Sequence, residues 1–109
     1  MENNTKQRLY GMLGFAMRAG KLIVGTDLVC RAMAKGGVKL TVVSSTASDS
    51  TKKKLFVKSE FYEIPAIEVE IDTERLGQLI GKTFAVAALA VTDDGFAEEI
   101  KKANLSTTL

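Results

Sequence analysis

The chain passes from a strand-like to a helix-like pattern within residues 22–33, Leu-Ile-Val-Gly-Thr-Asp-Leu-Val-Cys-Arg-Ala-Met. Leu22–Val24 is a short apolar run typical of a strand, and Gly25 and Thr26 then open a helix. We expect Thr26 to be the N-cap, because its hydroxyl can accept a hydrogen bond from a free N–H group of the first turn. One buried helix face is predicted from apolar residues at helical spacing: Val29, Ala32 and Met33. A strand that runs directly into a helix is a building unit of α/β proteins.

The same alternation continues in both directions along the chain. Periodicity and capping residues predict four further helices: Thr5–Ala19, from Ser48 or Asp49 to about Tyr62, Glu74–Ile80 after Asp72 or Thr73, and from Asp93 or Asp94 to about Ala103. Apolar runs predict three further strands: Leu40–Val43, Ala66–Ile71 and Phe84–Val91. The tail Asn104–Leu109 is expected to fray. This order predicts helices on both faces of a small, largely parallel sheet, with sites beyond the carboxyl ends of its strands.

Length and composition restrict the class of protein. With 109 residues, 46% hydrophobic and 26% charged, the chain is expected to form a single domain, 1–109, with a buried core. No apolar run reaches the roughly 18–20 residues that cross a bilayer, and no secretory signal is apparent, so we expect no membrane contact. Cys30 is the only cysteine and there is no histidine, which excludes an internal disulfide and a zinc site built from His and Cys. A reducing cytoplasm fits this composition.

Catalysis is poorly supported by the sequence. Without histidine, a Ser-His or Cys-His nucleophile pair is impossible. Cys30 lies within a predicted helix and is interpreted as a packing residue. The stretch Gly77–Thr83 is similar to a phosphate-binding P-loop, but it has three residues between its glycines instead of four and follows a helix instead of a strand. We therefore predict no catalytic residues, no metal ligands and no cofactor.

The charged residues indicate a local binding site and no general basic coat, because the net charge is only +2. The run Lys52–Lys54 would spread over about 200° of a helix and is interpreted as a solvated face. Asp27 and Arg31 are more informative, since they lie one turn apart beside the open N–H groups of a helix start. They can serve a polyanion, with Arg31 as a forked donor and Asp27 as an acceptor. The alternative is a structural ion pair between the two at i, i+4.

These motifs resemble a known family. Gly25–Ala32, Gly-Thr-Asp-Leu-Val-Cys-Arg-Ala, resembles the Gly-Thr-Asn-Glu-x-x-Lys-Ala signature of the archaeal L-seven-Ae and eukaryotic L-thirty-e ribosomal-protein family. Leu76–Gly81, followed by an apolar strand, resembles that family's second RNA-contacting loop. The segments Arg18–Lys21 and Val91–Ala97, together with the length, look most like the bacterial YlxQ-type members.

The resemblance implies a three-layer α/β/α sandwich with a four-stranded mixed sheet whose last strand is antiparallel. It also implies binding of kink-turn RNA, a sharply bent duplex with tandem sheared G·A pairs. In the family, the start of the second helix contacts these pairs and the second loop packs against unstacked bases. Carried over by position, the implied RNA-binding residues are Lys21, Gly25, Thr26, Asp27, Leu28, Arg31, Ile80, Gly81, Lys82, Thr83 and Phe84.

Several of these positions depart from the family pattern. Asp27 takes the Asn place and loses the amide donors, and Leu28 takes the Glu place and cannot accept a hydrogen bond. Arg31 takes the Lys place, so Arg31 and Lys82 preserve cationic positions. Residues 83–85, Thr-Phe-Ala, replace the Ser-Arg-Pro portion of the archaeal loop.

Three functions remain open at this point. The first is binding of structured RNA, with the kink-turn, ribosomal RNA and the ribosome as candidate partners. The second is a ribosome-assembly or protein-interaction module on the same fold with weakened RNA contacts, since fold does not fix function. The third is a binder of small molecules or nucleotides at the strand ends. The sequence does not reveal the oligomeric state.

Overall fold

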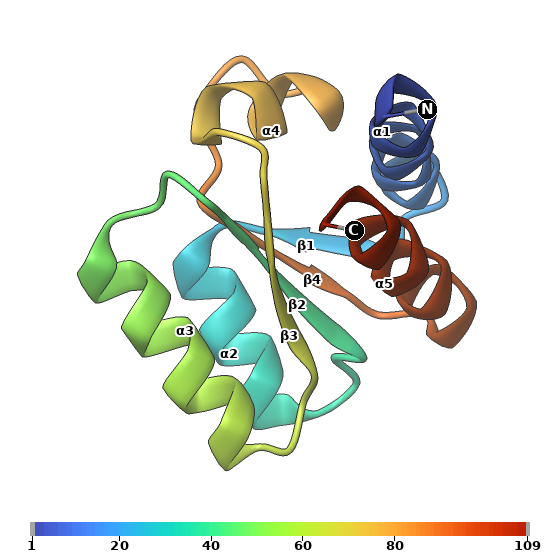
Figure 1. Ribbon diagram of the computed structural model, residues 1–109. Coiled ribbons are helices and arrows are strands. Elements are labelled where there is room, and N and C mark those ends of the chain that lie inside the picture. Colours follow the sequence, from blue (N-terminus) through green and yellow to red (C-terminus); the bar gives the residue numbers. More distant parts are fainter. Residues whose placement is uncertain (1, 109) are drawn as a thin grey trace.

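The computed structural model describes residues 2–108, and side chains within residues 6–105. Over this part of the chain, helices and strands alternate as the sequence predicts (Figure 1). The helices are α1 (Glu2–Arg18), α2 (Thr26–Lys35), α3 (Asp49–Phe61), α4 (Thr73–Leu79) and α5 (Asp94–Thr108). The strands are β1 (Leu22–Val24), β2 (Leu40–Ser44), β3 (Ala66–Val69) and β4 (Ala88–Val91).

The sheet is mixed and has the strand order β1-β4-β2-β3. Strands β2 and β3 are parallel, whereas β4 is antiparallel to both of its neighbours, β1 and β2. The mixed sheet with an antiparallel last strand is thus confirmed, and the expectation of a largely parallel sheet is wrong. The reason lies in α4, which sits beyond the end of β3 and covers neither face of the sheet (Figure 1). A parallel β4 would need a crossover that returns the chain along one face of the sheet. Because α4 makes no such crossover, the chain re-enters the sheet at the end where it left, and β4 runs antiparallel to its neighbours.

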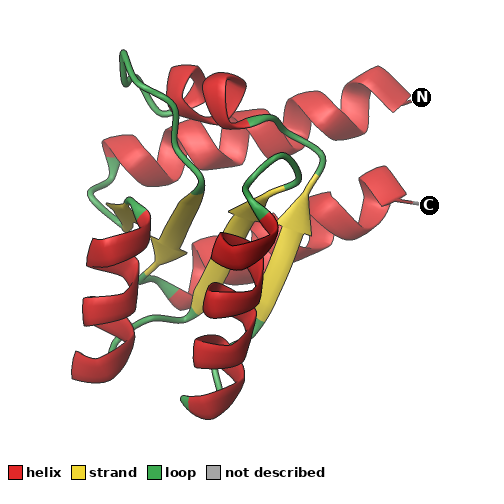
Figure 2. Ribbon diagram, turned by 90° about the vertical axis from the view of Figure 1, so that its left-hand side faces the viewer, coloured by secondary structure: helices red, strands yellow, loops and turns green. Residues whose placement is uncertain are grey.

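Helices cover both faces of the sheet, which confirms the three-layer α/β/α sandwich. Helices α2 and α3 lie on one face, and α1 and α5 pack against each other on the opposite one (Figures 1 and 2). Two apolar clusters fill the spaces between these layers. The larger, under α1 and α5, includes Leu9, Leu13, Leu76, Leu89 and Ile100. The smaller, under α2 and α3, includes Val29, Met33, Val43, Leu55, Ala88 and Ala90.

The structure selects among the alternative helix caps. Ser48 begins α3, with its Oγ accepting a hydrogen bond from the Thr51 amide at 3.2 Å. Asp72 begins α4, and its Oδ1 accepts from the Arg75 amide at 2.7 Å. Asp93 precedes α5, and its Oδ2 accepts from the Phe96 amide at 2.9 Å. For α2, however, the cap is Gly25 and no side chain caps the first turn, so the assignment of Thr26 as N-cap is wrong.

Three further boundaries differ from the prediction. The apolar run 84–91 is a strand only from Ala88, because its first residues form a loop in which Phe84 and Ala85 are exposed. Strand β3 ends at Val69, before the expected Ile71. Helix α5 continues past Ala103 to Thr108, so the tail does not fray over its first residues. This extension is anchored by Asn104, whose Nδ2 donates a hydrogen bond to the Glu68 carbonyl at 3.3 Å.

No helix in residues 2–108 is both long and apolar enough to span a membrane.

Candidate nucleic-acid interface

The start of α2 presents an open turn of backbone amides. Gly25 has φ 102° and ψ 142°, a conformation that only glycine adopts without strain. Its N–H donates to the Ala88 carbonyl at 3.0 Å, and its carbonyl accepts from the Val29 amide at 2.9 Å. The amides of residues 26–28 have no intrahelical acceptor, and in the described part of the chain no side chain caps them. Asp27 and Leu28 are exposed here, and Thr26 is half-buried.

The loop between α4 and β4 is held in one shape by backbone contacts. The Lys82 amide donates to the Gly77 carbonyl at 2.9 Å, and the Val86 amide donates to the Thr73 carbonyl at 2.9 Å. Gly77 lies so close to this loop that a Cβ atom at residue 77 would overlap the Phe84 carbonyl oxygen. The loop is thus clamped against α4 at both of its ends.

The loop exposes some of its predicted contact residues and buries one. Thr83 and Phe84 are exposed, the latter by 59%, and Lys82 is half-buried. Together with Glu74 and Gln78 of α4 they line a hollow of about 410 Å³. Ile80, however, is only 4% exposed and belongs to the core under α1 and α5. Its side chain is not available to RNA in this conformation, because it anchors the loop from below.

The two elements lie at the same end of the sheet. The loop runs directly into β4, whose first residue, Ala88, accepts the hydrogen bond from Gly25 at the start of α2. Figure 2 shows this loop at the top of the molecule, on the same side as the start of α2. The structure therefore brings residues 25–31 and 81–84 to one end of the sheet, although about fifty residues separate them in sequence.

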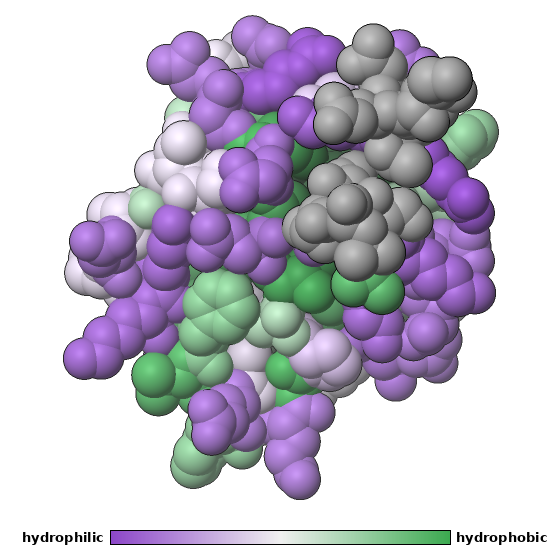
Figure 3. Space-filling model, viewed as in Figure 1, coloured by the Kyte–Doolittle hydropathy of each residue, from purple (hydrophilic) through white to green (hydrophobic). Residues whose placement is uncertain are grey.

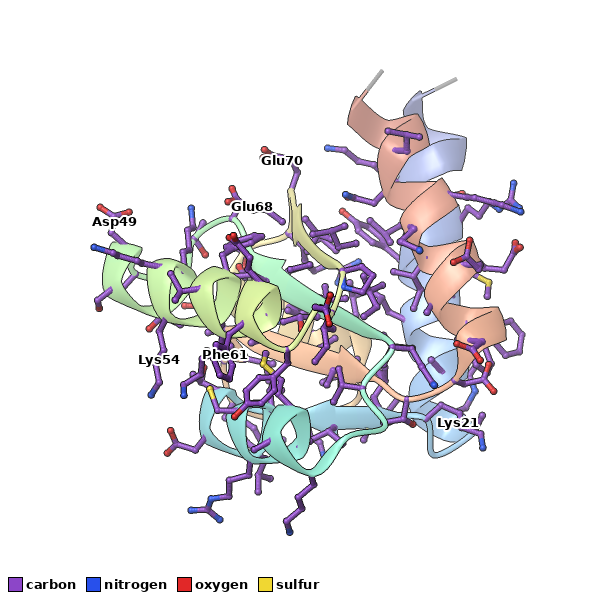
Figure 4. The ribbon with its side chains drawn as sticks, turned by 90° about the horizontal axis from the view of Figure 1, so that it is seen from below. Lys21, Asp49, Lys54, Phe61, Glu68 and Glu70 are labelled. Carbon is purple, nitrogen blue, oxygen red and sulfur yellow. The ribbon has the colours of Figure 1, made fainter. Side chains whose placement is uncertain are left out.

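Lys21 does not belong to this surface. It precedes β1, so the length of this strand separates it from Gly25. Its carbonyl accepts a hydrogen bond from the Thr92 amide at 2.9 Å, beyond the far end of β4. Figure 4 shows the Lys21 side chain next to α1 and α5, on the opposite side of the molecule from α3. The structure thus does not bring Lys21 together with the start of α2 or the loop after α4.

The two cations of the predicted site are Arg31 and Lys82. Among the described side chains, residues 6–105, no ion pair includes Arg31 or Lys82. The alternative of an Asp27–Arg31 pair is therefore not realised. Lys52, in contrast, has its Nζ 3.4 Å from the Glu68 carboxylate. An exposed, unneutralised Arg31 beside open amides is an arrangement that attracts anions.

Gly77 packs against the loop after α4, a contact that the sequence analysis does not predict. The signal was available, because an isolated glycine inside a helical pattern often has a packing reason. The sequence could not show that Gly77 packs against the Phe84 backbone, because this close approach depends on the path of the loop after α4.

Comparisons with known proteins agree with this fold. Residues 7–101 match the family model described as ribosomal protein L7Ae/L30e/S12e/Gadd45 family. The chain belongs to this family. A relative from Enterococcus faecium, named RNA-binding protein YlxQ, is 37% identical to this family member over 94% of this chain and 96% of its own. The large ribosomal subunit protein eL30 of Sulfolobus acidocaldarius is 33% identical, over 88% and 98% of the two chains. A solved structure of a Bacillus halodurans protein of unknown function superposes with a TM-score of 0.82 at 35% identity, covering 88% of this chain and 95% of its own.

Proposed function

We propose that this member of the L7Ae/L30e/S12e/Gadd45 family binds structured RNA that contains a sharp bend of the kink-turn kind. The observation that carries the proposal is the placement of the open start of α2 and the loop after α4 at one end of the sheet, linked through the Gly25–Ala88 hydrogen bond. Support also comes from the family and from relatives named as RNA-binding and ribosomal proteins. Two elements at an angle to each other can contact both arms of a bent duplex, which a straight duplex does not offer.

The start of α2 would recognise the base pairs at the bend. Its free amides and the Arg31 guanidinium are donors for phosphate oxygens and base acceptors. Asp27 is exposed and supplies an acceptor for the amino group of a base. Leu28, 53% exposed, can only make apolar contacts. Selectivity would therefore come mainly from the shape of the RNA, because one acceptor of the family pattern is missing.

The loop after α4 would hold the unstacked side of the bend. Phe84 offers an exposed ring on which a base can stack. Lys82 and Thr83 beside it can contact phosphate oxygens. Gly81, with φ 78°, and the buried Ile80 act as positioning residues that fix the loop. Lys21 is not part of this proposal.

The role proposed is binding without catalysis. We propose ribosomal RNA, in a cytoplasmic ribosome or its assembly intermediates, as the class of target that fits the ribosomal relatives. The interface contains donors, one acceptor and a stacking surface, and it brings together no nucleophile and base.

The test is a titration against a kink-turn RNA and a straight duplex of equal length, with Mg²⁺, at several salt concentrations. RNA folding is followed by fluorescence transfer between its ends, which approach each other when the kink forms. We expect tighter binding to the kink-turn at every salt concentration. Equal affinity for both RNAs would refute the selectivity, because phosphate contacts alone give sequence-independent, salt-sensitive binding.

A further inference from the structure

One side of α3 carries exposed apolar side chains, and no described part of the chain covers them. Phe61 is 77% exposed and Val57 is 57% exposed, and they lie one helical turn apart. The Tyr62 ring packs edge-on against Phe61, with the ring centroids 4.9 Å apart. In Figure 3, apolar atoms reach the surface over α3 among hydrophilic ones. Apolar side chains that share one exposed helix face often mark an interaction site.

Lysines surround this apolar centre. Ser50, Lys53, Lys54, Val57 and Lys58 line a hollow of about 450 Å³. Among the described side chains, none of the ion pairs includes any of these three lysines, whereas neighbouring Lys52 pairs with Glu68. Figure 4 separates the two sides of α3: Asp49, Glu68 and Glu70 lie on one side, and Lys54 and Phe61 lie on the side toward α2. The hollow around Val57 therefore has a basic rim, while exposed Glu60 lies next to Phe61 in sequence.

We propose that this face of α3 docks an acidic amphipathic helix of a partner protein. An apolar centre with a charged rim is the usual anatomy of a protein–protein interface. A helix with apolar residues at i and i+4 would place them against Val57 and Phe61, and flanking carboxylates would reach Lys53, Lys54 and Lys58. The site lies outside the RNA surface, because it includes no residue of the α2 start or of the loop after α4.

An RNA partner fits this face less well. Phe61 could stack on a base, but Val57 has no flat face and lies at the centre of the lysines. Phosphate oxygens could accept hydrogen bonds from these lysines, but the sugar and phosphate atoms that pack over Val57 would lose hydration and find no donor on it. A leucine or similar side chain fills this position without that loss. A second copy of this chain is disfavoured as well, since two copies of the basic rim would repel each other.

The test uses a synthetic amphipathic helical peptide with leucines at i and i+4 flanked by glutamates, labelled for fluorescence anisotropy. The control peptide has the same composition in scrambled order. We expect the amphipathic peptide to bind the full chain weakly and to lose affinity as salt is raised. Phe61→Ala and Lys54→Glu should each weaken it by about tenfold or more, and the scrambled peptide should bind about tenfold more weakly as well.

Matched variants separate this site from general effects. Phe15→Ala removes a ring that is 58% exposed on α1, and Lys6→Glu reverses an exposed charge on the same helix. Both should leave peptide affinity unchanged, and circular dichroism should show every variant folded. Equal losses in the matched variants, or no preference over the scrambled peptide, would overturn the proposal.

Two further titrations assign the face if it binds something else. Kink-turn affinity should not change in Phe61→Ala or Lys54→Glu. A parallel loss of RNA affinity in both would show that the face extends the RNA surface, and would overturn the docking of a protein. Binding to vesicles of anionic lipid that is abolished by Phe61→Ala would overturn it in favour of a lipid surface. Failure of kink-turn binding with intact peptide binding would refute the proposed function and leave this site standing.

Discussion

Strand β4 presents different side chains to the two helical layers. Against α1 and α5 it places Leu89 and Val91, and against α2 and α3 it places Ala88 and Ala90. The Gly25 amide donates to the Ala88 carbonyl, which continues the β1–β4 pairing up to the start of α2. One layer thus holds most of the large buried side chains, and the other holds the surfaces proposed to bind partners. We therefore expect the α1/α5 side of β4 to contribute mainly to stability and the α2/α3 side mainly to binding.

The strongest way to test this division is to remove a large side chain from the stabilising layer. Leu89→Ala deletes a fully buried side chain of the cluster under α1 and α5. We expect the free energy of unfolding to fall by about 2–5 kcal/mol, through lost burial and the cavity that remains. Urea unfolding measures this loss. Kink-turn affinity at a temperature where the variant is folded should not change, and a large loss of affinity there would contradict the division.

A methyl group added at Gly77 should instead damage binding. The new Cβ of Gly77→Ala would overlap the Phe84 carbonyl oxygen, so the loop after α4 must move. We expect stability to fall by about 1–3 kcal/mol, as in overpacked cores, and kink-turn affinity to fall with it. The matched control is Gly11→Ala in α1, where nothing lies within 4 Å of the new atom. That variant should gain about 0.5–1 kcal/mol, because alanine favours a helix over glycine. Unchanged kink-turn affinity in Gly77→Ala would show that the loop is not part of the RNA surface.

Arg31 should matter more to RNA than the lysine run of the same layer. Arg31→Ala is expected to cost about 1–3 kcal/mol of binding if the guanidinium reaches a base edge, and Lys82→Ala to reduce the salt slope by about one. The comparison is the triple variant Lys52/Lys53/Lys54→Ala, titrated against the same kink-turn RNA. All three proteins should stay folded, since exposed cations contribute little to stability. A larger loss in the triple variant would move the RNA surface to α3.

Helix caps allow a comparison of matched changes in the two layers. Ser48→Ala removes the cap of α3, and Asp93→Ala removes that of α5. Each should lower the free energy of unfolding by about 1 kcal/mol. Thermal unfolding measures both, and neither should alter kink-turn affinity. A much larger loss of stability in one of the two variants would show that its capping side chain stabilises more than the first turn of its helix.

The smallest expected effect is a gain in stability, from a substitution at Glu63. Glu63 follows α3 with φ 57°, a left-handed conformation that is strained for a residue with a Cβ atom. The turn is fixed, because the Ile64 amide donates to the Ser59 carbonyl at 2.8 Å. Glu63→Gly should therefore stabilise the protein by about 0.5–1 kcal/mol, read as a higher urea midpoint. A loss of stability would mean that the Glu63 side chain contributes more than the strain costs.

The order of the elements was predictable because its signals are local. Ser48, Asp72 and Asp93 cap their helices through hydrogen bonds that span three residues, so the sequence contains all the information. The direction of β4 was not predictable from periodicity, because it depends on where α4 sits relative to the sheet. Phe84 could not be assigned to a loop from its own pattern, since an apolar run looks the same whether its first residues are paired or exposed.

The candidate site was predictable in part. The motif located the start of α2, but spacing alone could not decide whether Asp27 pairs with Arg31, because i, i+4 allows the pair without requiring it. Burial of Ile80 could have been foreseen, since it lies four residues after Leu76 and both face the core. The connection between Gly25 and Ala88 is a long-range hydrogen bond, and no local pattern reports it.

The central position of β4 has a consequence for the synthesis of the chain. Strand β1 pairs only with β4, and β4 is the last strand to emerge from the ribosome. A nascent chain that ends before residue 88 can pair β2 with β3, but β1 and the start of α2 have no strand to join. The contacts that β4 makes with β1 and β2 are therefore distant in sequence, which favours late, cooperative folding. Incomplete translation products would lack an assembled RNA surface and could not compete with the finished protein for its target.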